Sequence, residues 1–330
     1  MGTGRSVGDS LFEGCTRLTE VVFPEGIDTI DGRTFAHCTS LTNVILPSTV
    51  IEIRDSAFEG CAALERLDLP AGLLEIERSV FKGCTSLLNI TLPAGVAFVE
   101  ERMFQDCTSL TNVTALTAQL FINDYAFQNC HSLLDIPSGA RIISIAQHAF
   151  GNCRSITCLS FPGPGSPAIS AYAFAGCTGL LKVDYPGPYG GFGGGLFSSF
   201  AFQGATSLGP IRLDDPLPFI SPTAFDGANQ SFIVYPGDQT TVSGRPVFDQ
   251  NPAATLDVSL VGGDTWQIRF HAVAGAQYQA YRLPTADAPT ADGVAVGSVV
   301  VGADAEAMVT VPATASGGLA FFRVEALPSN

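Results

Sequence analysis

The stretch Cys61-Ala-Ala-Leu64-Glu-Arg-Leu67-Asp-Leu69-Pro70-Ala-Gly-Leu-Leu-Glu-Ile76-Glu-Arg-Ser-Val-Phe81 is one unit of a repeat that decides the fold of most of this chain. The repeated phrase reads Phe-x-Gly/Asn-Cys-Thr-Ser-Leu. Successive copies lie 23 residues apart six times and then 24, 28 and 23 residues apart. A period this regular predicts a solenoid, in which each unit buries its apolar face only against its neighbours. The ten copies begin at Phe12, Phe35, Phe58, Phe81, Phe104, Phe127, Phe150, Phe174, Phe202 and Phe225.

Two further sets of apolar residues recur in each unit and indicate the rest of its core. The segment Leu-x-x-Val/Leu-x-Leu-Pro alternates apolar and polar residues in its second half, as a short strand does, and Pro ends the strand because it has no N–H to donate. These segments supply Leu18/Val21/Phe23, Leu41/Val44/Leu46, Leu64/Leu67/Leu69, Leu87/Ile90/Leu92, Leu110/Val113, Leu133/Ile136, Ile156/Leu159/Phe161, Leu180/Val183/Tyr185 and Leu208/Ile211/Leu213. A second column follows at Ile30, Ile53, Ile76, Val99, Ile122, Ile145, Ile169 and Ile220.

The repeat resembles the BspA-like class of leucine-rich repeat, whose signature is Ala-Phe-x-x-Cys-x-x-Leu-x-x-Val-x-Leu-Pro at 23 residues. The resemblance covers roughly residues 10–235, although Ala205 and Ala228 replace the cysteine in the last units and residues 162–167 and 186–200 are insertions. It implies a right-handed, β-rich solenoid with a parallel sheet along its concave side. It also implies bacterial surface or secreted proteins that bind other macromolecules.

A second domain is expected after the repeats. Residues 1–236 are predicted to form the solenoid of about ten repeats, residues 237–255 a junction that could hold one degenerate rung, and residues 256–330 a small antiparallel β-sandwich of immunoglobulin-like type. The whole chain is therefore expected to be mainly β. The predicted strands of the second domain are Leu256–Val261, Thr265–Val273, Ala276–Leu283, Gly293–Val301, Ala305–Val311 and Leu319–Leu327.

Composition narrows the class of partner. With 46% hydrophobic and 14% charged residues the chain is expected to fold, and its net charge of −15 argues against nucleic acid and anionic membrane surfaces. No run of eighteen apolar residues is present, so we expect no membrane insertion. The first repeat begins by Phe12 without a capping unit or signal peptide, which favours a fragment whose signal sequence lies upstream.

The cysteines at the repeated position are expected to stack in one column. A disulfide or metal ladder is one interpretation, but side chains in register point in parallel, and Ala replaces Cys in two units. We therefore expect a buried slot for a small apolar group. Cys158 lies off the repeat at an outward strand position. We interpret it as an incidental exposed cysteine, and the alternatives are a free thiol with a function, a modification site or an intermolecular link. The column comprises Cys15, Cys38, Cys61, Cys84, Cys107, Cys130, Cys153 and Cys177.

Residues that alternate with the core in the strand segments should point outward from the sheet. Their polar and charged groups suit hydrogen bonding with an extracellular protein or glycan, although such residues can also merely keep a sheet soluble. The predicted binding residues are Glu20, Asn43, Arg66, Asp68, Asn89, Thr91, Asn112, Thr114, Asp135, Ser160, Lys182, Asp184 and Arg212. The glycine-rich insertion at 186–200 is a second candidate, through Tyr189 and Phe192, with Phe197 or Phe200 expected to fill the core.

No catalytic, cofactor or metal site is predicted. The four histidines are scattered, no Cys-x-x-Cys is present, and no nucleophile has a recognisable partner. We expect a non-enzymatic surface or secreted protein for recognition and adhesion. The alternatives are a structural spacer or self-associating envelope element, and an intracellular scaffold in a reducing compartment that suits unpaired cysteines.

Overall fold

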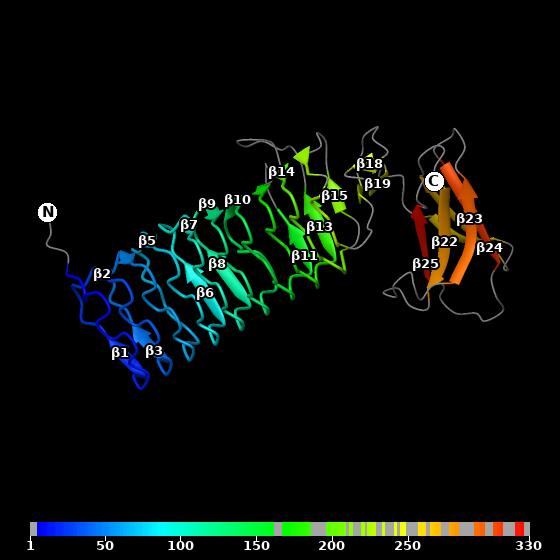
Figure 1. The fold of residues 1–330 in the computed structure, drawn as a ribbon. Coiled ribbons are helices and arrows are strands. Elements are labelled where there is room, and N and C mark those ends of the chain that lie inside the picture. The colour runs from blue at the N-terminus through cyan, green and yellow to red at the C-terminus, as the bar shows by residue number, and fades with distance from the viewer. Residues whose placement is uncertain are drawn as a thin grey trace. The chain divides into compact units, whose positions relative to one another are not determined.

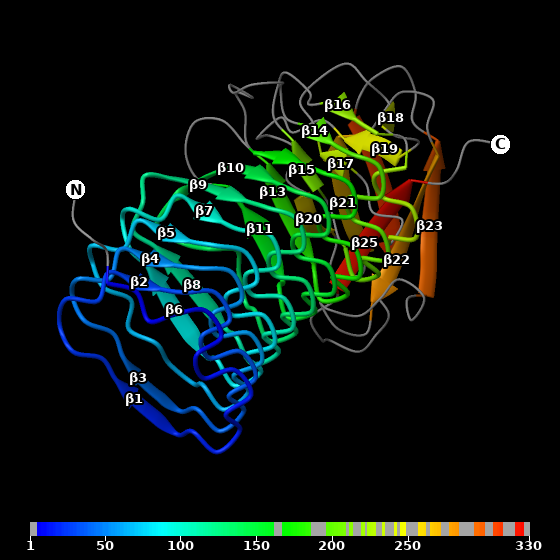
Figure 2. The ribbon, with the colours of Figure 1, turned by 60° about the vertical axis from the view of Figure 1, so that its left-hand side comes forward.

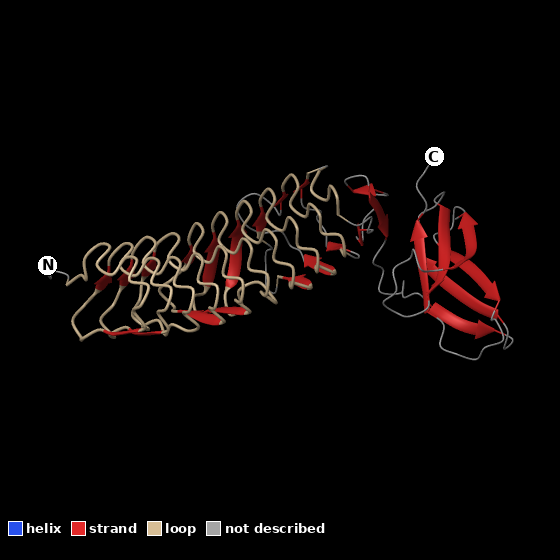
Figure 3. Ribbon diagram, turned by 60° about the horizontal axis from the view of Figure 1, so that its bottom comes forward, coloured by secondary structure: helices blue, strands red, loops and turns tan. Residues whose placement is uncertain are grey.

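The computed structural model of the chain divides into two compact units, Met1–Ser231 and Phe232–Asn330 (Figure 1). In the first unit it describes residues 5–161, 167–185, 196–208, 211–213, 219–221 and 223–228. In the second it describes only strands, between residues 233 and 326. Every regular element of the described residues is a strand, and none is a helix (Figure 3).

The first unit is a parallel β solenoid. Its short strands form two separate columns along the length of the solenoid (Figure 2). Equivalent residues of consecutive repeats align, as in the pairs Val21–Val44 and Ile30–Ile53. The first column holds β1 (Glu20–Val22), β3 (Asn43–Ile45), β6 (Asn89–Leu92), β8 (Asn112–Ala115), β11 (Cys158–Ser160), β13 (Lys182–Tyr185) and β15 (Ile211–Leu213). The second holds β2 (Thr29–Ile30), β4 (Glu52–Ile53), β5 (Glu75–Ile76), β7 (Phe98–Val99), β9 (Gln119–Ile122), β10 (Arg141–Ile145), β12 (Ala168–Ile169), β14 (Leu196–Phe197) and β16 (Phe219–Ile220).

Tight turns around the repeated Phe close each rung of the solenoid. The residues two before and two after Phe127, Tyr125 and Asn129, have φ values of 58° and 64°, in the left-handed region. The same two positions are left-handed in most repeats, and Gly occupies the second one in several of them, for example Gly60. The turns bond to one another as strands do: Phe127 N donates to Ala149 O at 2.7 Å. The turns therefore form a third hydrogen-bonded ladder beside the two strand columns.

The predicted core is confirmed for most of its residues, whereas Phe12, Leu18, Val21, Phe23, Leu46 and Leu69 are half-buried and the side chain of Leu213 lies outside the described ones. The repeated Phe rings lie in one stack, with centroids 5.0–5.9 Å apart and interplanar angles of 2–15°. The second apolar column is buried from Ile30 to Ile169, whereas Ile220 is half-buried. In the insertion near residue 200, Phe197 is the residue that enters the core, and it packs edge-to-face on Phe202. The rest of that insertion, residues 186–195, lies outside the described residues.

The cysteine column is buried except at Cys15, which is exposed, and all nine thiols are free. Each buried thiol also makes a contact that the sequence does not reveal. Cys107 Sγ donates to Phe81 O at 3.0 Å, and the same bond recurs from Cys38 to Cys177 at 3.0–3.2 Å. The slot therefore accommodates a weak donor as well as a small apolar group.

Two predicted strands are absent from the first column. Residues 66–68 form no strand, and neither does the segment around Asp135. In the second case Ile136 N donates to Asp135 Oδ1 at 2.7 Å and Pro137 has no N–H, so only an isolated bridge remains, in which Ser138 bonds to Val113 O and Ala115 N of β8. The first column is therefore interrupted and does not form one continuous sheet.

The second unit contains a short mixed group of strands and two antiparallel sheets. β17 (Ile233–Val234) pairs in parallel with β19 (Arg245–Phe248), which pairs antiparallel with β18 (Thr241–Val242), so part of the predicted junction forms strands. The two sheets have the orders β20-β21-β24 and β23-β22-β25. Their six strands begin and end within two residues of the six predicted runs: β20 (Asp257–Val261), β21 (Thr265–His271), β22 (Gln277–Leu283), β23 (Val294–Val300), β24 (Glu306–Pro312) and β25 (Phe321–Ala326).

Candidate functional site

The predicted binding residues occupy outward positions along the first column. Most of them are exposed, whereas Thr114 and Asp184 are half-buried. Arg212 pairs in register with Asp184 through the backbone of β15, but its side chain is not among those described. The structure thus spreads these residues along the solenoid and does not gather all of them into one site.

Several of these residues bind one another. Asn43 Nδ2 donates to Glu20 Oε1 at 2.6 Å, and Asn112 Nδ2 donates to Thr114 Oγ1 at 3.3 Å. Lys182 Nζ lies 2.6 Å from Asp184 Oδ2. Residues that are already paired in this way would lose those contacts on binding a partner, so they contribute less to recognition than their polarity suggests.

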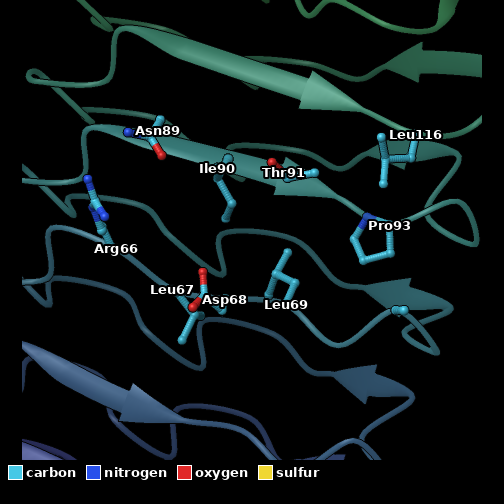
Figure 4. Close-up of a pocket in the computed structure, with 10 residues that line it drawn as sticks. Arg66, Leu67, Asp68, Leu69, Asn89, Ile90, Thr91, Pro93 and Leu116 are labelled. Atoms are coloured by element: carbon cyan, nitrogen blue, oxygen red, sulfur yellow. The ribbon is translucent and has the colours of Figure 1, made fainter.

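Four of the predicted residues come together around one groove (Figure 4). Arg66 and Asp68 line it from one rung, and Asn89 and Thr91 line it from the next. All four are exposed, and within the described residues none of their side chains makes a hydrogen bond or an ion pair. The groove has a volume of about 240 Å³, and its apolar wall includes Leu69, Pro93 and Leu116.

The groove lies where the strand ladder is interrupted. β1 and β3 form one two-stranded sheet and β6 and β8 form another, with the strandless residues 66–68 between them. At the same place the second column breaks between β5 and β7, which belong to different sheets. The turns remain joined here, because Phe81 N donates to Met103 O at 3.0 Å. The two rungs are therefore held at the turn side and by one backbone bond at the start of the first column, where Leu88 N donates to Glu65 O at 3.2 Å, and they form no strand pair in either column.

Carboxylates gather at the break in the second column. Glu75 and Glu77 from one rung and Glu100 from the next line a shared hollow with Asp55 and Arg78. Arg54 pairs with Asp31 at 2.9 Å one rung earlier, and Arg78 pairs with Asp55 at 3.4 Å in this hollow. Like charges on facing positions of neighbouring strands disfavour pairing. Glu77 and Glu100 thus place like charges beside the break between β5 and β7, but β4 and β5 pair although Glu52 faces Glu75, so like charge alone does not account for the break.

Cys158 also lies on the first column but does not line the groove. Partial burial raises the pKa of its thiol, and the nearby carboxylates of Asp184 and Asp135 raise it further, against the opposing effect of Lys182. A raised pKa leaves little thiolate at neutral pH, so this cysteine is a poor nucleophile.

Sequence reasoning missed an aromatic stack on the turn side. Tyr125, His148, Tyr172 and Phe200 occupy the left-handed position two residues before the core Phe, and successive rings are 4.8–5.1 Å apart. Arg102 caps the stack, with its guanidinium carbon 5.4 Å from the centre of the Tyr125 ring. The signal was present as an aromatic residue at the same repeat position in four successive units.

The described part of the chain offers no arrangement for metal chemistry. No group of three or more His, Cys, Asp or Glu side chains is placed there to hold a metal ion. In the same residues no helix is long and apolar enough to cross a membrane. What the groove offers a partner is the hydrogen-bonding groups of Asn89 and Thr91, the opposite charges of Arg66 and Asp68, and a short apolar wall.

Comparison with protein families gives one match. The family described as BspA type leucine rich repeat region matches residues 5–134 and 116–231, in six copies. No catalytic family is indicated. No curated protein matches the chain.

Several solved structures are similar to this chain. A leucine-rich repeat protein of T. pallidum is 28% identical, over 46% of this chain and 71% of that protein, with a TM-score of 0.44. A leucine-rich repeat protein from Bacteroides ovatus is 26% identical, over 68% of each chain, with a TM-score of 0.42. A leucine rich cell surface protein from Faecalibacterium prausnitzii is 22% identical, over 72% of this chain and 86% of that protein, with a TM-score of 0.33.

Proposed function

The chain belongs to the family of BspA type leucine rich repeat proteins, and on that premise we propose that it is a non-enzymatic recognition protein of a bacterial surface. Its partner is an extracellular protein or glycan, and it is bound along the first strand column. The surface location and the adhesive role rest on the resemblance of the repeat to surface proteins of this class.

The groove between residues 66–69 and 89–93 is the observation that carries this proposal. Side chains that make no contact within the protein keep their full hydrogen-bonding capacity for a partner. Arg66 and Asp68 are such groups, whereas the bases Arg33, Arg54, Arg78 and Lys82 of the same solenoid are engaged in ion pairs. Unpaired polar groups therefore concentrate in this groove on the predicted face.

A rigid solenoid favours binding over an extended face. The Phe stack and the turn ladder fix the positions of the rungs before a partner arrives, so little conformational entropy is lost on association. Affinity then comes from many modest contacts, with the groove as the site where two charges are desolvated together. The stack that fixes the rungs contains all ten repeated Phe rings, from Phe12 to Phe225.

The C-terminal unit has a supporting role in this proposal. We propose that residues 256–330 form an immunoglobulin-like sandwich that serves to tether the protein, and that the binding surface lies in residues 1–236. No catalytic step is assigned to either part.

The test is a binding screen with a matched pair of variants. The immobilised chain is offered a panel of extracellular-matrix proteins and polysaccharides, beside the variant R66E/D68K/N89R. The control variant R154E/D226K/Q203R makes the same charge changes at exposed residues outside the first strand column. The proposal predicts at least one component bound by the wild type and by the control but not by the groove variant.

The opposite results separate the alternatives. Binding that both variants retain would contradict the location of the site. A wild-type chain that binds no component would remove the recognition function and favour a structural spacer of the envelope.

A further inference from the structure

We propose that the groove takes an extended peptide segment, which pairs through its backbone with the strandless residues 66–69 and places an acidic and a basic side chain opposite Arg66 and Asp68. This inference rests on the proposed recognition function and names the class of partner and its mode of binding. It follows from the state of the backbone, the placement of the charges and the size of the groove.

Four consecutive backbone N–H groups of this rung are unsatisfied, although Glu65 O just before them accepts from Leu88 N. Within the described residues, no hydrogen bond is made by the N–H groups of Arg66, Leu67, Asp68 and Leu69. β3 and β6, on either side, each pair with one neighbour only, so both have an open edge toward this rung. Peptides that add to an open strand edge gain affinity from main-chain hydrogen bonds, whatever their sequence. The interruption therefore provides a binding edge in the middle of a strand column, where paired repeats leave none.

The charges of the groove match the geometry of an extended peptide. Arg66 and Asp68 are two residues apart on the same rung, which is the spacing of side chains on one face of an extended chain. They pair neither with each other nor with another described residue. A peptide with alternating acidic and basic residues meets both charges at once. Asn89 and Thr91 then contact the same peptide from the next rung, and each can donate or accept a hydrogen bond.

The size and lining of the groove favour a peptide over a small molecule or a sugar. Its volume of about 240 Å³ is below the roughly 300–1,000 Å³ of small-molecule sites, so it suits a short part of a polymer chain better than a whole small molecule. Its apolar wall comes from aliphatic residues such as Leu69 and Leu116 and from Pro93. No aromatic ring lines it, so a sugar ring finds no face on which to stack.

The experiment uses the full chain and a library of displayed twelve-residue peptides. Peptides retained by the wild type are synthesised, and their dissociation constants are measured for the wild type, R66A/D68A and the control R154A/D226A. Each peptide is also made with single N-methylated residues, which remove one backbone donor and leave the side chains unchanged. Thermal unfolding of each variant checks that it is folded.

The inference predicts peptides with alternating acidic and basic residues. R66A/D68A should weaken their binding at least tenfold, the control should change it less than twofold, and N-methylation at alternate residues should weaken it at least tenfold. Peptides indifferent to N-methylation, or to R66A/D68A, would overturn the inference, as would failure to recover any peptide.

These outcomes are separate from those of the proposed function. If a component of the extracellular panel binds and the groove variant loses it, the recognition function stands, even if no peptide competes for the groove. A polysaccharide that competes while peptides do not would assign the groove to a glycan and contradict this inference.

Discussion

At the scale of single residues, the cysteine column shows how a small side chain supports a solenoid. Cys107 is fully buried, and its thiol bonds to the carbonyl of Phe81. Burial raises the pKa of Cys177 to about 12 and those of its neighbours in the column from Cys61 to Cys153 strongly, so these thiols stay protonated. A protonated thiol is both the donor that this bond needs and an unreactive group.

Replacing Cys107 by Ala should lower the free energy of unfolding by about 1–2 kcal/mol, because a buried sulfur and its hydrogen bond are both lost. The chain already has Ala205 at the equivalent position, so C107A should still fold. C15A, at the exposed end of the column, is the control and should change stability by less than about 0.5 kcal/mol. Urea denaturation measures both, and equal effects would contradict a buried role for Cys107.

His148 should make the stability of the protein depend on pH, because it lies in the aromatic stack on the turn side. Burial against Tyr125 and Tyr172 lowers the pKa of its imidazole, and the opposing effect of the Asp124 carboxylate is smaller. As pH falls through the unfolded value of about 6.5, the unfolded chain binds a proton before the folded chain does. Stability should therefore fall on acidification from pH 7 to pH 5, through this residue.

The variant H148F keeps a ring in the stack, as Phe200 does in the same left-handed conformation, but removes the titration. The difference in unfolding free energy between H148F and the wild type should grow in favour of H148F as pH falls from 7 to 5. A difference that is constant with pH, or that grows in the other direction, would show that His148 is not desolvated in the stack.

At the scale of structural elements, the turns hold the rungs together by their own hydrogen bonds, in addition to the strands. Asn129 has a φ of 64°, donates to Asp106 Oδ1 at 2.8 Å and accepts from Asn152 Nδ2 at 2.9 Å. Asn tolerates the left-handed region, where most side chains are strained. This position therefore combines a backbone requirement with a ladder of side-chain hydrogen bonds.

N129G and N129A separate these two contributions. Both lose the ladder bonds, but Gly keeps the left-handed backbone at no steric cost, whereas Ala adds about 1 kcal/mol of strain. N129A should therefore be the less stable variant, by about 1 kcal/mol in urea denaturation. If N129A were equal to N129G or more stable, the turn conformation would not be what Asn129 provides.

The absence of a strand at residues 66–68 could not be predicted from the sequence. Alternation in Leu64-Glu-Arg-Leu67-Asp-Leu69 correctly predicts that Leu64 and Leu67 are buried, whereas Leu69 is half-buried and lines the groove. Strand pairing depends on two rungs at once. Glu77 and Glu100, for example, line one hollow only after the two rungs have folded against each other. No described side chain accounts for the loss of pairing at residues 66–68 of the first column.

At the scale of the whole molecule, the repeat made the solenoid fold predictable from the sequence, but it did not show which outward residues form the binding site. One 23-residue period places every core Phe, because each unit repeats the same contacts with its neighbours. The same pattern assigned thirteen equivalent outward residues and could not rank them. Ranking these residues as binding candidates required the structure. It shows that Glu20 pairs with Asn43 and Lys182 with Asp184, whereas Arg66 and Asp68 have no partner among the described residues.

Hydrogen exchange, measured by mass spectrometry on the free chain and on its complex with the tightest-binding component of the extracellular panel, tests the central claim most directly. In the free chain, the amides of residues 66–69 should exchange faster than those of the paired strands β6 and β8. In the complex, exchange should slow at residues 66–69 and 89–93. Slowed exchange confined to the turn side or to the second column, with residues 66–69 unchanged, would contradict recognition in the groove.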